Sequence, residues 1–434
     1  MKRNLAFLFL AAFVLCTALM AAVCVRSPNG WCDFNLRMNE LACLRQGVDP
    51  YSVWHEDVVL PPYCSNLPKR PVPSGCMEQV NAYVPWAYTL MLPLSFPPRE
   101  IAWVFYSLLM GAALLVTVRL GGMLAGGESD RADRLLTAVV PLVMVSYLLW
   151  SNAAVGNFAL FVLAASVLMA WCLSRGHDVL AGFCWAVAMI KPQSALLFAV
   201  PLLMRRKWAM CIVAAASCLA LSLVPMFFCG TPLIALLREG PAANAELFLG
   251  CGTYPHFLLG LFGNDVEIGI GLIFGTLLCV AMTGCIRRER DWLTLMMPAA
   301  ICGASWTYTQ AYSHAMGWFV AFVIVRDLVR HPRSKFLWAL MALSLFVLTR
   351  WFLAWHGLSA VVGWQFPMSE YAFRCVDSLN STASLAIALA YCVWKGRPRS
   401  EVAMKFSDAL ASVLKQSAPQ NSPSRYLQAA NTRP

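Results

Sequence analysis

Charged residues are scarce in this 434-residue chain. Only 13% of the sequence is Asp, Glu, Lys or Arg, whereas 59% is hydrophobic. Soluble domains carry about 25% charged residues, so the composition excludes a soluble enzyme or binding domain. Long apolar runs recur along the whole sequence, and a bilayer core of roughly 30 Å takes about 20 apolar residues per helix. We therefore predict an all-α polytopic membrane protein.

The sequence also lacks the motifs of soluble-cofactor chemistry. It contains no Walker loop, no dinucleotide-binding glycine pattern, no zinc signature and no Gly-x-Ser-x-Gly elbow. We therefore expect neither a cofactor nor a metal site. The net charge of +11 would suggest nucleic acid in a soluble protein, but here basic residues must first be sorted by membrane side. No nucleic-acid partner is predicted.

About twelve membrane spans are expected in a domain covering residues 1–394. The first apolar run, residues 5–25, is longer than the core of a signal peptide and indicates a retained anchor with a cytoplasmic N-terminus. Further runs begin near Ile101, Leu135, Phe158, Val179, Gln193, Ala209, Val266, Trp292, His314, Phe336 and Val376. Residues 395–434 form a basic tail, expected to be disordered and to contact anionic cytoplasmic lipid.

The distribution of basic residues agrees with this arrangement. The positive-inside rule places Lys and Arg in cytoplasmic loops, and the outer segments hold few of them. The predicted cytoplasmic segments contain Arg119, Arg131, Arg134, Arg175, Arg205, Arg206, Lys207, Arg287, Arg288, Arg290, Arg326, Arg330, Arg333 and Lys335. The predicted location is therefore the plasma (inner) membrane.

A Lys-Pro pair interrupts the apolar stretch 179–204. If this stretch were one kinked span, the basic clusters after it would face outward, so we predict two short helices with Lys191 at the tip between them. Each half is too short to cross the hydrocarbon, so the tip lies at membrane depth. An ammonium there needs water or an anion such as phosphate; the alternative is a lysine that snorkels to the outer surface.

Similar short pairs are expected elsewhere in the chain. Residues 135–150 pair with 158–173, and residues 292–304 pair with 314–325. Irregular polar backbone at membrane depth implies a cavity lined by protein. The polar or aromatic residues at these tips are Asn152, Asn157, Trp306, Tyr308 and His314.

One long outer loop, residues 26–100, follows the first span. Residues 33–41 and 83–94 have the pattern of amphipathic helices at the membrane surface. The loop also holds Cys32, Cys43, Cys64 and Cys76, and four cysteines on an oxidising face allow three disulfide pairings that the sequence does not distinguish.

Several short motifs resemble glycosyltransferase family 87, whose members are polytopic enzymes of the GT-C type that use polyprenyl-phosphate sugars. The resemblance covers roughly the first half of the chain. It departs from the family's Tyr-x-Pro-Pro at Tyr83-Val84-Pro85-Trp86 and from Gly-Gln at Gly156-Asn157. The motifs that carry it are the segment from Asp33 to Gly47-Val48-Asp49-Pro50-Tyr51, then Tyr83-Val84-Pro85-Trp86, Leu92-Pro93-Leu94, Gly156-Asn157, Arg175-Gly176, Ala181-Gly182, Ile190-Lys191-Pro192, Arg205-Arg206-Lys207-Trp208, and, more weakly, Ser305-Trp306 and His314.

The resemblance implies a GT-C-like bundle whose catalytic base is Asp33, beside the first span. Without the resemblance, an Asp at a membrane interface is more often solvated or a helix cap. Lys191, His314 and Arg37 are the candidates for binding the donor phosphate. An exposed surface pair with Asp33, one helical turn away, explains Arg37 equally well, and a satisfied core histidine explains His314.

Aromatic and amide side chains are the candidates for binding sugar or acceptor. Aromatic residues at membrane interfaces are also routine anchors, which is the competing interpretation. The candidates are Tyr51, Tyr83, Trp86, Asn157, Trp306 and Tyr308.

The expected activity is transfer of a hexose, usually mannose in this family, from a polyprenyl-phosphate donor to an extracytoplasmic glycan or glycolipid. A different class is also possible: a secondary transporter that binds an anionic solute with Lys191 and His314. The inverted repeat typical of such transporters is not visible in the sequence. A third hypothesis is a non-catalytic scaffold that binds lipid or glycan.

Overall fold

The computed structural model describes residues 32–47, 49, 83–126, 156–237, 264–305, 315–349 and 370–396. Within these ranges every regular element is a helix, so the predicted all-α class is confirmed for the described part. In chain order the helices are α2 (Cys32–Arg45), α3 (Pro85–Met91), η2 (Leu92–Ser95), α4 (Arg99–Gly126), α7 (Ala159–Ser174), α8 (Asp178–Ala188), α9 (Pro192–Ala195), η3 (Leu196–Phe198), α10 (Ala199–Met204), α11 (Trp208–Cys229), α14 (Asn264–Cys285), α15 (Trp292–Gly303), α16 (Trp318–Arg330), α17 (Lys335–Thr349) and α19 (Glu370–Gly396).

Two stretches of the described helices, Ile101–Ala125 and Trp208–Cys229, are long and apolar enough to cross a bilayer. Shorter apolar helices begin at or near most of the other predicted starts. The runs that begin at residue 5 and near Leu135 lie outside the described residues. The count of twelve spans therefore stays a prediction, while the two amphipathic segments of the outer loop correspond to α2 and to α3 with η2.

The stretch around Lys191 is a helical hairpin. Helix α8 ends at Ala188, and α9 begins at Pro192 with Lys191, in a non-helical conformation, as its N-cap. Proline pushes the preceding residue out of the helical region, which explains the break. At the other end, Asp178 at the start of α8 pairs with Lys207 just after α10 at 2.8 Å, so the chain returns to the end where it began. The two predicted short helices are confirmed, and a single kinked span is wrong.

Helices α15 and α16 form a second hairpin, close to the predicted pair. Asp291 caps α15 by accepting the Thr294 N–H at 2.8 Å, and it also pairs with Arg326 near the end of α16. The tips of the two hairpins touch: a Cβ added to Gly303 would lie 2.5 Å from the carbonyl oxygen of Ser194. The absence of a side chain at Gly303 therefore permits the close approach.

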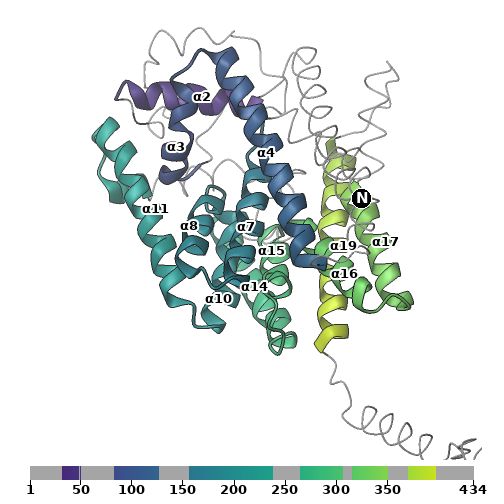
Figure 1. Cartoon of the computed structure of the whole chain (residues 1–434). Helices are drawn as coiled ribbons and strands as arrows, with labels where there is room; N and C mark the ends of the chain where they lie inside the picture. The colour runs from purple at the N-terminus through teal and green to yellow at the C-terminus, as the bar shows by residue number, and fades with distance from the viewer. Residues whose placement is uncertain are drawn as a thin grey trace, which may run out of the picture.

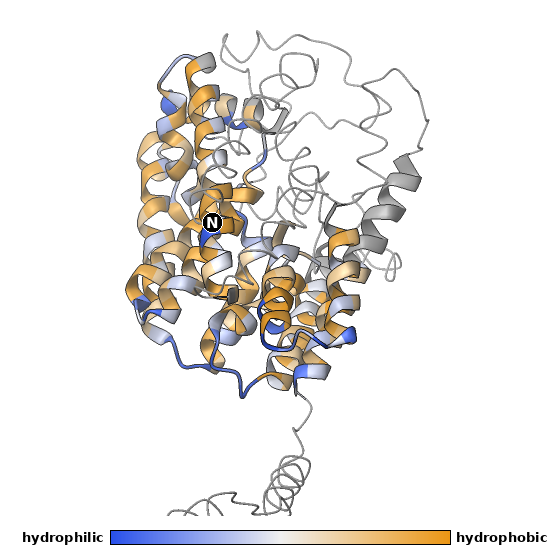
Figure 2. Cartoon of the chain, turned by 45° about the vertical axis from the view of Figure 1, so that its right-hand side comes forward, coloured by the Kyte–Doolittle hydropathy of each residue, from blue (hydrophilic) through white to orange (hydrophobic). Residues whose placement is uncertain are grey.

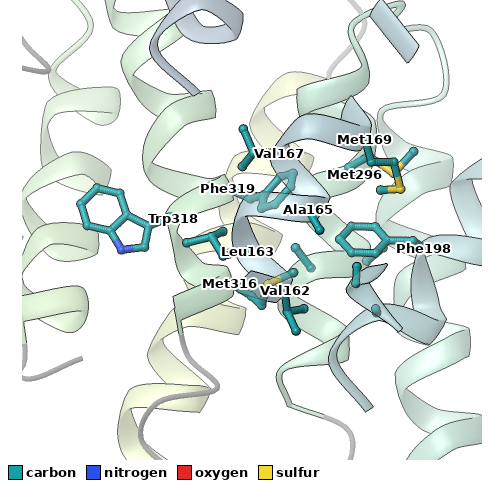
Figure 3. Packing of buried hydrophobic residues seen from close by; sticks show 14 of the residues in the cluster. Val162, Leu163, Ala165, Val167, Met169, Phe198, Met296, Met316, Trp318 and Phe319 are labelled. Atoms are coloured by element: carbon teal, nitrogen blue, oxygen red, sulfur yellow. The ribbon is translucent and has the colours of Figure 1, made fainter. Parts of the chain in front are cut away.

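The two hairpins share a hydrophobic core with α7. In Figure 3, Phe198 of the first hairpin lies near Met296 and Phe319 of the second, among side chains of α7. The rings of Phe198 and Phe319 are fully buried, with centroids 5.9 Å apart. Close van der Waals packing of these side chains fixes the hairpins relative to one another, because packing rather than removal from water holds helices together within a bilayer.

The two ends of the bundle differ in character. Helix α2 lies crosswise over one end (Figure 1), and polar loops gather at the opposite end (Figure 2). At that opposite end Arg205 donates hydrogen bonds to the carbonyls of Arg287, at 2.7 Å, and Glu289. The basic loops after α10 and α14 therefore lie next to one another at the same end of the bundle. The positive-inside rule predicts that both loops are on one side of the membrane. We call this the basic end.

A buried ionic cluster lies at the basic end. The carboxylate of Asp327, with no exposed surface, accepts hydrogen bonds from Tyr391 at 2.7 Å and Lys395 at 2.8 Å and pairs with Arg326 at 3.0 Å. Burial would raise the pKa of Asp327, but the adjacent cations and the tyrosine hydroxyl hold the pKa below its usual value. This cluster joins α16 to α19, and through Asp291 to α15.

Candidate functional site

The site begins with Asp33 and Arg37 on α2. The backbone of Asp33 lies in the first turn of α2, and its side chain is outside the described part. Arg37 is one helical turn further along, and residues at this spacing share a face. Its side chain is buried, with 1% of the residue exposed, and it pairs with Glu40 at 2.8 Å. The interpretation of Arg37 as an exposed surface residue is therefore wrong.

Tyr83 brings two of the predicted phosphate-binding cations together. The guanidinium carbon of Arg37 lies 4.8 Å from the centroid of the Tyr83 ring, and the ammonium of Lys191 lies 5.8 Å from the same centroid. Lys191 is only 5% exposed, which argues against a lysine that snorkels to the surface. Both distances are within the range of cation–π attraction, so one ring stabilises both charges.

Aromatic side chains on α2, on α4 and just before α7 surround this arrangement. The rings of Tyr83 and Phe158 pack edge to face, with their centroids 5.9 Å apart. The centroid of the Phe158 ring lies 5.3 Å from that of Tyr106 on α4. Tyr106 in turn lies 4.9 Å from Phe34 of α2. Buried rings exclude water and lower the local dielectric, which strengthens any interaction between the cations and a bound anion.

Two other predicted residues, Asn157 and Trp86, make hydrogen bonds within the protein. The side-chain oxygen of Asn157 accepts the Ala159 N–H at 3.0 Å, at the start of α7, and the Asn157 carbonyl accepts the Tyr106 hydroxyl at 2.6 Å. The indole of Trp86 donates to the carbonyl of Met189, 2.9 Å away, at the end of α8. Their contact with sugar or acceptor stays a prediction.

Four predicted residues, Tyr51, Trp306, Tyr308 and His314, lie outside the described residues. The last three belong to residues 306–314, which follow Ser305 at the tip of the second hairpin. Of the four loop cysteines, Cys43 is buried in α2, while the side chain of Cys32 and all of Cys64 and Cys76 are not described. The disulfide framework also stays a prediction.

Sequence reasoning missed three members of the site. Glu40 is not among the predicted site residues, although its position three residues after Arg37 on a helix allows the observed pair. Tyr106 and Phe158 were counted only as members of apolar spans. The signal for Tyr106 is its hydroxyl, since a buried tyrosine usually needs a hydrogen-bond partner, here the Asn157 carbonyl. Nothing in the sequence indicates the role of Phe158.

The arrangement suits recognition of a phosphate. A guanidinium binds phosphate oxygens through two parallel N–H groups, and an ammonium adds a point charge. Both groups are held in place before any ligand arrives, because Arg37 is on a packed helix and Lys191 is at the start of α9. Preorganised cations of this kind stabilise negative charge that develops on a leaving group.

The model of glycosyltransferase family 87 matches residues 81–305, more than half of the chain. The chain belongs to this family. The match includes Tyr83, Trp86, Asn157 and Lys191, whereas Asp33 and Arg37 precede it. No curated protein and no solved structure matches the chain. The protein is therefore a membrane glycosyltransferase, and the hypothesis of a secondary transporter is not favoured.

Proposed function

We propose that the protein transfers a hexose, with mannose the expected sugar, from a polyprenyl-phosphate donor to an extracytoplasmic glycan or glycolipid. Family membership supports glycosyl transfer. The observation that carries the choice of donor is the meeting of Arg37 and Lys191 at the buried ring of Tyr83. Two buried cations at one ring fit a donor whose leaving group is a phosphate.

The proposed reaction is a direct displacement with inversion. The acceptor oxygen attacks the anomeric carbon of the sugar, and the bond from that carbon to the donor phosphate oxygen breaks. Asp33 accepts the proton of the acceptor hydroxyl. Arg37, Lys191 and His314 stabilise the charge that the departing polyprenyl phosphate gains.

The surface of the bundle supports a donor dissolved in lipid. Apolar side chains on α11 point away from the protein: Ile212 is 67% exposed and Phe227 is 79% exposed. Exposed apolar residues in such numbers are typical of a surface that faces lipid tails. A polyprenyl chain reaches the protein through the same medium, so the reaction requires no nucleotide sugar.

The test is a transfer assay with purified protein, radiolabelled polyprenyl-phosphate mannose and a membrane extract as acceptor. Lys191→Met and Arg37→Met each remove a positive charge but retain a long apolar stem. Charge-assisted hydrogen bonds contribute about 1.5–3 kcal/mol, so each change should weaken donor binding about 10- to 100-fold.

Arg288→Met is the matched control, since Arg288 is exposed at the basic end. It should leave donor binding unchanged. Wild-type affinity for polyprenyl phosphate in both site variants would refute the assignment of these cations to the donor phosphate. Transfer from a nucleotide sugar in place of the lipid donor would refute the proposed donor class.

A further inference from the structure

The tip that carries Lys191 is held by a hydrogen bond from a neighbouring helix. Helix α8 ends at Ala188, so the carbonyl of Met189 lies beyond the helix and accepts the indole N–H of Trp86 at 2.9 Å. A carbonyl at membrane depth needs a protein donor, because lipid supplies none. Met189 is two residues before Lys191, so this bond acts directly on the segment that places the ammonium.

The donor helix is itself firmly anchored. On α3, Ala87, Tyr88 and Met91 are buried, and Thr89 donates a hydrogen bond to the carbonyl of Leu221 on α11 at 2.5 Å. The indole of Trp86 is therefore carried by a helix that is anchored to α11 as well as to the hairpin.

The same helix reaches the tip at two points. Tyr83, just before α3, lies against the Lys191 ammonium, and Trp86 bonds to Met189. Inside the hairpin, Trp185 donates to the carbonyl of Ala195 at 2.9 Å, which joins α8 to α9 across the tip. Two indoles thus satisfy carbonyls on both sides of Lys191.

We infer that Trp86 is a positioning residue, which sets the place of the Lys191 ammonium by bonding to the Met189 carbonyl. The inference rests on the proposed function, in which Lys191 binds the donor phosphate. It assigns Trp86 a role other than stacking on sugar.

The first test measures the tip itself, independently of activity. Trp86→Phe keeps an aromatic ring but removes the N–H. In the purified full-length protein, hydrogen–deuterium exchange of peptides spanning residues 186–196 should become about 3- to 10-fold faster, the range that corresponds to one net hydrogen bond. Trp338→Phe is the matched control: its indole donates to the carbonyl of Pro332 at 3.0 Å at the basic end. It should not change exchange at the tip.

The second test measures whether Trp86 acts through Lys191. Trp86→Phe should raise the KM for the donor about 3- to 10-fold and leave the KM for the acceptor unchanged, whereas loss of a sugar-stacking residue for the acceptor would do the reverse. In a Lys191→Met background the same substitution should change the donor KM by less than about twofold, because coupled residues are not additive.

The outcomes separate this inference from the proposed function. Unchanged exchange at residues 186–196 would overturn the positioning role of Trp86. An equal rise in the donor KM on Trp86→Phe in the wild type and in Lys191→Met would overturn it as well. A normal donor KM in Lys191→Met together with faster exchange in Trp86→Phe would instead overturn the assignment of the donor phosphate. The positioning of the tip by Trp86 would then stand.

Discussion

Both ends of the bundle bury cations, but they surround them with different groups. At the basic end, Arg326 and Lys395 contact the carboxylate of Asp327, and Asp291 completes the cluster. At the α2 end, Arg37 and Lys191 meet at the ring of Tyr83. The carboxylates at the basic end join three helices, whereas at the α2 end the ring of Tyr83 joins two cations from separate segments, and Glu40 pairs with Arg37 within α2. The contrast indicates a structural role for the first end and a chemical role for the second.

This comparison makes opposite predictions for the two ends. At the α2 end, Asp33→Asn and Lys191→Met should change transfer and leave the free energy of unfolding nearly unchanged, whereas Arg37→Met should lower both, because Arg37 is paired with Glu40. Substitutions in the ionic cluster should lower the free energy of unfolding and leave the donor KM unchanged in the protein that folds.

The largest expected effect is that of Asp33→Asn. The change is nearly isosteric and keeps hydrogen-bonding capacity, but it removes the proposed base. General-base catalysis contributes about 10²–10⁴-fold, so initial rates of transfer should fall by about that factor with normal donor binding and thermal stability. Asp49→Asn is the control, since Asp49 accepts a hydrogen bond from Thr231 at 2.6 Å. Near-normal transfer in Asp33→Asn would mean that Asp33 is only an acidic residue in the first turn of α2.

The sequence predicted the helices and several residues of this site, but it did not predict that these residues lie next to one another. The break at Lys191 follows from a local signal, a proline, and the sequence also places a helix at Arg37, although its predicted amphipathic character is not evident in the structure, where Arg37 is buried. The meeting of these residues at Tyr83 depends on how α2, α3 and the first hairpin pack, which no local pattern encodes. The sequence also predicted that Arg326 lies in a cytoplasmic segment. It did not predict that Arg326 is buried, because its burial depends on Asp327, Asp291 and Lys395, which come together from three segments.

The second prediction concerns Asp327→Asn at the basic end. Removing one partner of a buried ion pair costs about 3–5 kcal/mol, because the remaining charges stay buried. Chemical denaturation in detergent should show that loss, while the donor KM of the folded fraction stays normal. A raised donor KM with unchanged stability would contradict the comparison.

The pH dependence of stability gives a second test of the ionic cluster. The pKa of Asp327 is lowered in the folded protein, so its contribution to stability is present above the unfolded pKa of about 3.9 and is lost as the pH falls further. The wild type should therefore lose more stability than Asp327→Asn below about pH 4.

A smaller effect is expected for Gly303→Ala, where the two hairpin tips touch. The added Cβ would lie 2.5 Å from the backbone oxygen of Ser194, so the tips must separate. Overpacking of this kind costs about 1–3 kcal/mol, and the displaced tip should also raise the donor KM. Gly284→Ala in α14 is the matched control, because nothing lies within 4 Å of its added Cβ. It should be neutral or stabilise the protein by up to about 1 kcal/mol. Equal stability of the two variants would show that the tips do not make this contact.

The smallest expected effect is that of Asp178→Asn, which breaks the ion pair at the base of the first hairpin. The carboxylate of Asp178 and the ammonium of Lys207 lie 2.8 Å apart, as close as Lys395 and Asp327, but their side chains are 30% and 27% exposed. Water and salt screen a pair of this kind, so its loss should cost at most about 1 kcal/mol and less at high ionic strength. Denaturation curves at low and high salt measure both quantities. The two ion pairs have similar distances. If Asp327→Asn lowers the free energy of unfolding several times more than Asp178→Asn does, then burial, rather than the separation of charges, makes the basic end stable. A loss from Asp178→Asn as large as that from Asp327→Asn, and insensitive to salt, would contradict this explanation.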